Sequence, residues 1–377
     1  MTRRITRRIT RRITWGVLAT AAGLRLALGH LPAIRPASLA DHALCRDPAT
    51  GLMRLVAAPG RQADVALLDD PSGEDAATLD FLETALGADQ PFVGDQGHGR
   101  RAQDGTIRGA VTEGGEPEGL GLALLAELLA WRGHAPAESL ARRRGSLAVA
   151  ACSRLRATVS APTSLRRRAS RADTETAALR HPYAAFFAVE ERDIAWRRFD
   201  GTLSKPVTRV VFVSGDAVTV LPWDRVRDRV LVVEQFRAGP LVRGDAQPWQ
   251  IEAVAGRIDP GETPEAAARR EALEEAGLQL RDLHLVARFY PSPGAVSEYL
   301  YSYVAEADLP DDAAGVFGLE EEAEDIRGHL LSVDHLLDLV ASGEIENAPL
   351  ILTALWLQRE RQRQHAHSRD PAADLAG

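Results

Sequence analysis

Lysine is nearly absent from this 377-residue chain, which has 44 arginines but a single lysine, Lys205. We interpret the arginine excess as a bias of GC-rich coding, because a formal net charge of -8 offers no broad basic surface to nucleic acids. Cysteine is equally scarce, and Cys45 and Cys152 are over a hundred positions apart. A disulfide framework and a zinc site are not expected, and the composition favours a protein of the reducing cytoplasm that binds no nucleic acid.

Long apolar runs are also missing. After a repeated TRRI unit, the stretch Trp15 to Gly29 (WGVLATAAGLRLALG) is apolar, but Arg25 interrupts it and it is shorter than the about 20 residues that span a bilayer. No small-x-small cleavage site follows it. The alternative is a twin-arginine export signal or a membrane anchor. We interpret residues 1–14 as an Arg-rich tail left by an expanded start and expect no membrane association.

Aromatic residues make up only 5% of the chain, whereas hydrophobic residues reach 45% and charged residues 26%. These values are typical of a soluble globular protein with cores of small and aliphatic side chains. The length allows two or three domains of roughly 100 to 200 residues. Changes in composition predict a tail (1–14), a small α+β domain (15–100), a helical connector ending in a linker near 161–178 (101–178), an α/β domain (179–363) and a second tail (364–377).

β-branched runs dominate the second half. The segments VTRVVFVS, AVTVLPW, RVLVVEQF, WQIEAVAG, LVARFY and EYLYSYVA are predicted as strands, and helices are predicted over 264–276 and near 333–342 and 349–362. Mixed strands with flanking helices favour a layered α/β/α sandwich. In the first domain, the short runs MRLVAAP and ADVALLD, split by Pro and Gly, and a helical pattern at AATLDFLETALG suggest α+β structure.

The helix over 264–276 carries its own boundary signals. Thr263 suits the N-cap, Pro264 the first helical position and Gly277 the left-handed position after the last turn. Alanines keep this helix thin, so that it can lie close to a sheet. Upstream, Gly256 and the Pro260-Gly261 pair indicate a tight loop.

Three carboxylates crowd this helix. Glu271 and Glu275 stand at i,i+4, where like charges repel, and Glu274 lies beside them. A hard cation such as Mg²⁺ takes oxygen ligands and would remove that repulsion. The alternative is an ordinary solvated helix with an Arg270–Glu274 ion pair. The spacing decides between them: Gly256, Glu262, Arg270-Glu271, Glu274-Glu275 and Gly277-Leu278 follow at offsets that resemble the Nudix box, GX5EX7REUXEEXGU, with Ala272 at the first U.

The resemblance implies a Nudix hydrolase, which cleaves nucleoside diphosphates linked to another group. YPSPGAVSEYLYSYVA (290–305) is similar to the proline-containing segment of ADP-ribose pyrophosphatases, and LEEEAEDIR (319–327) to their catalytic loop. Other segments, including NAPLILTALWL, extend the likeness over roughly residues 181–360. By composition alone, LEEEAEDIR is an ordinary acidic loop.

Roles follow from the resemblance, position by position. It implies that Mg²⁺, or Mn²⁺, binds the backbone carbonyl of Ala255 and the side chains of Glu271, Glu275 and Glu324. Glu322 is then the general base.

Substrate contacts are implied by the same resemblance. Phe187, or its neighbour Phe186, and Arg209 are candidates to sandwich the adenine, although each Phe also suits a core and Arg209 a surface. Arg237 is a candidate for the phosphates. In this subfamily a second protomer helps to close the nucleoside pocket, which implies a homodimer.

The front half is similar to γ-glutamylcyclotransferase-like domains over residues 15–100. Glu83 lines up with the catalytic acid of that family, but the substrate loop YGTL is replaced by Trp15-Gly16-Val17-Leu18, so an inactive domain is expected. The two-part arrangement resembles Nudix proteins associated with bacterial tellurite resistance.

The expected function is Mg²⁺-dependent hydrolysis of ADP-ribose to AMP and ribose 5-phosphate. Hydrolysis of ADP-glucose or another nucleotide sugar is an alternative, because the box recognises only metal and diphosphate. A sensor that binds ADP-ribose without cleaving it is another, although such sensors tend to lose box glutamates that this chain retains.

Overall fold

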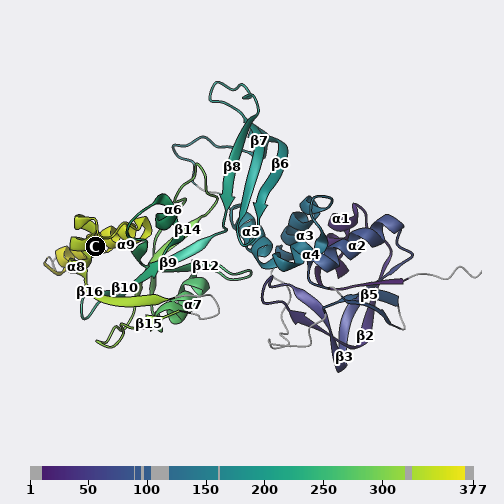
Figure 1. Cartoon of the computed structure of the whole chain (residues 1–377), viewed down its shortest axis with the longest axis horizontal. Coiled ribbons are helices and arrows are strands. Elements are labelled where there is room, and N and C mark those ends of the chain that lie inside the picture. The colour runs from purple at the N-terminus through teal and green to yellow at the C-terminus, as the bar shows by residue number, and fades with distance from the viewer. Residues whose placement is uncertain are drawn as a thin grey trace, which may run out of the picture. The chain divides into compact units, whose positions relative to one another are not determined.

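The structure is a computed structural model that describes residues 11–88, 90–94, 97–102, 119–159, 162–318 and 325–369. The chain divides into two compact units, Met1–Val213 and Ser214–Gly377 (Figure 1). Within the described ranges, no helix has both the length and the apolar character that a bilayer span requires.

The first unit begins with a five-stranded mixed sheet in the order β2-β3-β1-β5-β4. Its strands are β1 (Arg11–Thr14), β2 (Ile34–Arg46), β3 (Met53–Asp69), β4 (Gln90–Gly94) and β5 (Gly97–Arg101). The helices of this unit are η1 (Gly16–Ala19), α1 (Ala21–Leu28), α2 (Gly73–Ala85), α3 (Leu120–Trp131), α4 (Ala137–Arg142) and α5 (Arg144–Arg156). Leucines and alanines of the sheet and these helices share one core, so the first unit has the expected α+β character. The prediction of a separate helical connector over 101–178 is corrected, because α3, α4 and α5 pack into this same core.

Strand β1 corrects the prediction that residues 1–14 are all tail. Arg11–Thr14 form the central strand, antiparallel to β3 and parallel to β5. Ile13 and Thr14 have no exposed surface, and Arg12 keeps only 3%. The repeat looked like a tail because its partners lie tens of residues downstream, and only pairing on both sides makes this segment a strand.

Strand β3 corrects the expectation of two short runs. It continues through Pro59 and Gly60, where Ala40 pairs with Gln62 and His42 with Ala57, so that residues 58–61 of β3 form a bulge opposite Asp41 of β2. There Asp41 has a φ of 57° and Gly60 a φ of 75°, and the backbone N–H of Gly60 donates to Asp41 Oδ1 at 2.9 Å. Pro59 therefore interrupts the ladder without ending the strand.

A three-stranded antiparallel sheet completes the first unit, in the order β6-β7-β8. It follows the short helix η2 (Arg171–Asp173) and consists of β6 (Thr174–Ala184), β7 (Ala188–Trp196) and β8 (Val207–Val213). The linker expected near 161–178 therefore ends earlier, because residues 174–178 already pair with β7.

This small sheet is fastened to the helices of its own unit. Arg154 on α5 donates to Glu190 on β7 at 2.6 Å. The ring of His181 on β6 lies 3.9 Å from that of Trp131 on α3. These contacts explain why the units divide after Val213, whereas composition suggested a boundary between 178 and 179.

The second unit holds an eight-stranded mixed sheet, whose main path is β13-β14-β9-β10-β16-β15. Strand β12 pairs with β9, and β11 with β10. The strands are β9 (Ala217–Asp224), β10 (Arg229–Phe236), β11 (Trp249–Glu252), β12 (Val254–Arg257), β13 (Leu283–Phe289), β14 (Leu300–Glu306), β15 (Val316–Phe317) and β16 (Ile326–Ser332). The helices are α6 (Ala238–Arg243), α7 (Pro264–Ala276), α8 (Val333–Ser342) and α9 (Ala348–Arg369).

Helices cover both faces of this sheet. The period of two along β9 sends Val218 and Val220 to a core under α7, and Leu221 to a second core under α8 and α9. The predicted α/β/α sandwich is confirmed for the second unit. Its first layer, α7, brings the carboxylates of the Nudix-like spacing onto β12.

Candidate active site

Helix α7 begins and ends where the sequence predicts. The Thr263 hydroxyl accepts the backbone N–H of Ala266 at 3.2 Å, Pro264 is the first helical residue, and Gly277 adopts a φ of 63°. Four alanines facing the sheet are buried, namely Ala267, Ala268, Ala272 and Ala276. These short side chains let the helix lie close to the sheet and fix the height of every carboxylate on it.

The glutamates of α7 differ in burial. Glu271 is 9% exposed and Glu275 3%, so both are turned toward the sheet. The Glu274 side chain keeps 32% of its surface and lies at the rim. The two buried carboxylates are those predicted as metal ligands.

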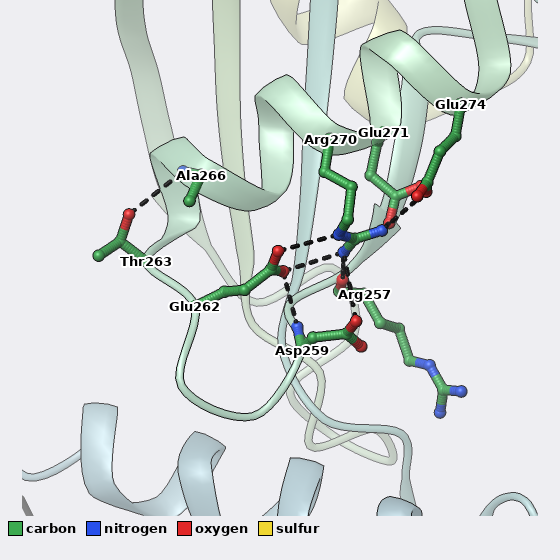
Figure 2. Close-up of polar contacts among 8 residues, drawn as sticks. All are labelled: Arg257, Asp259, Glu262, Thr263, Ala266, Arg270, Glu271 and Glu274. Carbon is green, nitrogen blue, oxygen red and sulfur yellow. Dashed lines mark hydrogen bonds and ion pairs between the residues drawn. The ribbon is translucent and has the colours of Figure 1, made fainter. Parts of the chain in front are cut away.

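Arg270 holds this group of acids together (Figure 2). Its guanidinium donates to both oxygens of Glu262, at 2.9 and 3.0 Å, and to the backbone carbonyl of Arg257 at 2.9 Å. It also donates to Glu271 Oε1 at 2.8 Å and to Glu274 Oε2 at 3.0 Å. Burial alone would lower the pKa of Arg270, but its hydrogen bonds to Glu262 and the charge of Glu271 raise it. The repulsion within the acidic cluster is thus offset in part by one arginine.

The backbone of β12 forms the floor of the site. The N–H of Ala255 donates to Glu275 Oε2 at 3.0 Å. Gly256 lies directly under Glu271, and a Cβ at this glycine would come within 1.9 Å of Glu271 Oε1. Only glycine leaves room for that carboxylate, which gives the glycine of the spacing a physical reason.

The charge of the buried carboxylates favours binding of a cation. Burial raises the pKa of Glu271 to about 7, although Arg270 lowers it. The charged form of Glu271 is therefore destabilised, and a bound cation would stabilise it. Two buried carboxylates beside a backbone strand are hard oxygen donors, so Glu271, Glu275 and the Ala255 carbonyl fit an ion such as Mg²⁺. In the described ranges no three His, Cys, Asp or Glu side chains lie close enough together to hold a metal ion among themselves. The expected fourth ligand, Glu324, and the expected base, Glu322, lie outside the described residues.

Arg237 lies just after β10, and its surroundings were not predicted. Its Nε and Nη2 donate to Glu252 Oε2 at 3.0 and 2.7 Å. Burial raises the pKa of the nearby Glu298 carboxyl, and the charge of Arg237 lowers it. Neither acid belongs to the box spacing, so no sequence pattern indicated that they lie near this arginine.

The register of the three-stranded sheet separates the two predicted nucleoside contacts. The ring of Phe187 lies 4.8 Å from that of Phe186 and 4.9 Å from that of Phe212. Arg209 lies three residues before Phe212 on β8, on the order of 10 Å away and on the opposite face of the strand. Its guanidinium carbon is 5.8 Å from the Trp196 ring. Within one chain, Phe187 and Arg209 are therefore not brought together.

The front-half residues form a closed core. Trp15 is 1% exposed and its indole N–H donates to the carbonyl of Arg100 at 2.9 Å. Glu83 is fully buried, contacts the Arg12 guanidinium through Oε2, and burial raises its pKa to about 8. Its Oε1 has no hydrogen-bond partner among the described residues.

Sequence comparisons agree with this geometry. The family model described as NUDIX domain matches residues 213–353. Over 190 residues, 50% of this chain and 90% of the relative, the sequence is 40% identical to the ADP-ribose pyrophosphatase of Escherichia coli (strain K12). This chain belongs to the Nudix family.

Nudix relatives with another named substrate also match. The GDP-mannose pyrophosphatase of Yersinia pestis (strain Pestoides F) is 33% identical over 150 residues, 40% of this chain and 74% of that protein. A solved structure described as an ADP compounds hydrolase aligns with 51% of this chain and 98% of that chain, at 22% identity and a TM-score of 0.39, a likeness too weak to carry an inference. The Nudix assignment therefore stands on the sequence matches.

Proposed function

We propose that this Nudix hydrolase cleaves the diphosphate bond of ADP-ribose, giving AMP and ribose 5-phosphate. The observation that carries the proposal is the buried pair Glu271 and Glu275, seated on the backbone of Ala255 and Gly256. The relative that is 40% identical is named an ADP-ribose pyrophosphatase, which supports this substrate over GDP-mannose, the name attached to the 33% match.

The chemistry is a hydrolysis at phosphorus. In the proposed mechanism the oxygen of a water forms a bond to one phosphorus, the bond from that phosphorus to the bridging oxygen breaks, and the water proton passes to Glu322. Ala255, Glu271, Glu275 and Glu324 would hold the cation, Mg²⁺ or alternatively Mn²⁺. When bound, such an ion supplies charge neutralisation of the diphosphate and polarises the water.

The remaining roles concern substrate binding. Arg237 is proposed to bind the phosphates, for which its planar fork of N–H donors is suited. Phe187 and Arg209 are kept as separate candidates for stacking on the adenine, since the register of β8 places them apart.

A homodimer is proposed on the exposed apolar surface of the three-stranded sheet. Tyr183 is 58% exposed, Val210 52% and Phe212 38%, so this sheet retains apolar area for a partner of its own kind. Light scattering after size exclusion tests this, and a monomer at micromolar concentration would contradict it. Within the described residues Cys45 and Cys152 form no disulfide bond, and on that ground we propose a cytoplasmic enzyme.

For the front half we propose a cyclotransferase-like domain without that activity. The buried Trp15 in place of the loop tyrosine supports the loss. The association with tellurite resistance is a proposal from the two-part arrangement, and deletion of the gene followed by tellurite challenge tests it.

The decisive experiment follows AMP or GMP release from ADP-ribose, ADP-glucose and GDP-mannose by the full chain with Mg²⁺. ADP-ribose should have the highest kcat/KM. Glu271→Gln and Glu322→Gln should each lower turnover by orders of magnitude while leaving the circular dichroism spectrum unchanged. If ADP-glucose or GDP-mannose has the highest kcat/KM, that nucleotide sugar is the substrate instead. If the protein binds ADP-ribose tightly but hydrolyses none of the three compounds, it is a sensor. A fully active Glu322→Gln variant means that the base is another residue.

A further inference from the structure

The side chain of Arg237 donates twice to one oxygen of a buried carboxylate. Its Nε and Nη2 both donate to Glu252 Oε2, at 3.0 and 2.7 Å. The backbone N–H of Arg237 donates to the carbonyl of Pro248 at 2.9 Å. Glu252, at the end of β11, is only 6% exposed, so its charge is largely withdrawn from water and is directed at this guanidinium.

Glu252 is in turn held by the start of helix α9. Asn347 Nδ2 donates to Glu252 Oε1 at 3.1 Å. The amide oxygen of the same side chain accepts the backbone N–H of Leu350 at 3.0 Å, which is the bond of a helix N-cap. The side chain of Asn347 therefore links the start of α9 to Glu252 by hydrogen bonds, and Glu252 in turn accepts the hydrogen bonds of Arg237.

The carboxylate of Glu252 is restrained from two sides. Each oxygen of Glu252 has its own donor, Arg237 on one side and Asn347 on the other, so the carboxylate cannot rotate without losing one of them. Gln235 Nε2 lies 3.4 Å from Glu252 Oε2 and adds a third, weaker restraint. The guanidinium plane is therefore set before any ligand arrives.

We propose that Glu252 and Asn347 are positioning residues that preset the Arg237 guanidinium for the diphosphate of the substrate. This inference rests on the proposed function, in which Arg237 binds the phosphates. A long arginine side chain samples many rotamers, and holding one of them in advance removes that ordering step from binding. Because Arg237 contacts the phosphates both before and during cleavage, its displacement should weaken ground-state and transition-state binding alike and act mainly on KM.

Asn347→Asp tests the role of the amide. Aspartate is an equally good N-cap, so α9 keeps its cap, but the N–H donor is lost and a second carboxylate faces Glu252. In the full chain we expect KM for ADP-ribose to rise about tenfold with kcat changed less than about twofold. The affinity for a methylene-bridged analogue of ADP-ribose, which cannot be hydrolysed, should fall by the same factor in calorimetry. Glu252→Gln, which keeps the shape and removes the charge, should act in the same direction.

A double-mutant cycle separates positioning from a general loss of structure. If Asn347 acts through Arg237, adding Asn347→Asp to Arg237→Ala should lower analogue affinity no further. Ser332→Ala is the matched control, because Ser332 caps α8 and is not in the chain of bonds to Arg237. It should leave KM unchanged.

Three results would overturn the inference: wild-type analogue affinity in both Asn347→Asp and Glu252→Gln, an undiminished effect of Asn347→Asp in the Arg237→Ala background, or an equal effect of Ser332→Ala. Failure of the proposed function looks different. In that case the wild-type chain hydrolyses no nucleoside diphosphate sugar, whereas the analogue affinities still decide whether Asn347 and Glu252 position Arg237.

Discussion

Gly256 and Glu271 are in such close contact that the Cβ of any other residue at position 256 would lie 1.9 Å from Glu271 Oε1 and 2.0 Å from its Cδ. The atoms in the way are the far end of one flexible side chain, so the carboxylate can move while the backbone stays. Gly256→Ala should therefore leave the melting temperature nearly unchanged. It should lower kcat/KM by about 100-fold, because the carboxylate of Glu271, the proposed metal ligand, would be displaced by about an ångström from its catalytic position.

A matched glycine provides the control for this prediction. Gly73, at the start of α2, has nothing within 4 Å of its Cβ position. Gly73→Ala should keep full activity. If Gly256→Ala hydrolyses ADP-ribose as fast as the wild type, the carboxylate of Glu271 is not needed where the structure places it.

Arg270 should not tolerate lysine. A lysine has one ammonium and cannot reach Glu262, Glu271 and Glu274 together, as the guanidinium does. We expect Arg270→Lys to lower kcat/KM by roughly 10- to 100-fold and the unfolding free energy by about 1–2 kcal/mol. Steady-state kinetics and thermal unfolding measure the two effects.

The neighbouring arginine distinguishes catalysis from stability. Arg269 donates to the backbone carbonyls of Leu280 and Arg281, the latter at 2.8 Å. Arg269→Lys should cost stability without changing kcat/KM. Equal losses of activity in the two variants would show that the acidic cluster does not depend on Arg270.

Removing one predicted ligand should change the metal requirement. Gln at position 275 can still accept the N–H of Ala255, so Glu275→Gln should fold normally. We expect the Mg²⁺ concentration for half-maximal activity to rise at least about tenfold, and chelation by EDTA to abolish activity reversibly. Glu274→Gln, at the exposed rim, should shift that concentration less. The opposite ranking would assign the ligands differently.

The stability of the first unit should depend on pH through Glu190. Burial alone would raise the pKa of Glu190, but the nearby His181 ring and the charges of Arg154 and Arg192 lower it to about 2. The unfolded chain, with a pKa near 4.5, binds this proton first, so the stabilisation is complete above about pH 4.5 and is lost as the pH falls toward 2.

Calorimetry of the full chain checks this window. Glu190→Gln should be less stable than the wild type by roughly 3 kcal/mol at pH 6, and the difference should shrink toward zero as the pH approaches 2. Glu175→Gln, on the exposed face of β6, serves as the control and should show no such dependence. A gap that stays constant between pH 6 and 3 would show that Glu190 gains nothing from its ion pairs.

Local chemistry made much of the second unit predictable. Thr263, Pro264 and Gly277 predict the bounds of helix α7, and β-branched runs predict the strands. Both kinds of signal are local, because caps and period-two patterns involve only a few neighbouring residues. Less of the first unit could be predicted from the sequence. β1 and the passage of β3 through Pro59 depend on partners far along the chain, which no local pattern specifies.

The sequence by itself determined the family, through the spacing of the box, and the α/β/α layers, through the patterns of strands and helices. The same spacing singled out Glu271 and Glu275 as the proposed metal ligands on α7. Only the tertiary structure decided which groups oppose those carboxylates. The contact of Gly256 with Glu271, the reach of Arg270 to Glu262 and the bond from Asn347 to Glu252 all join segments that are separated along the chain. Such contacts depend on how strands and helices pack, and packing is a property of the whole fold.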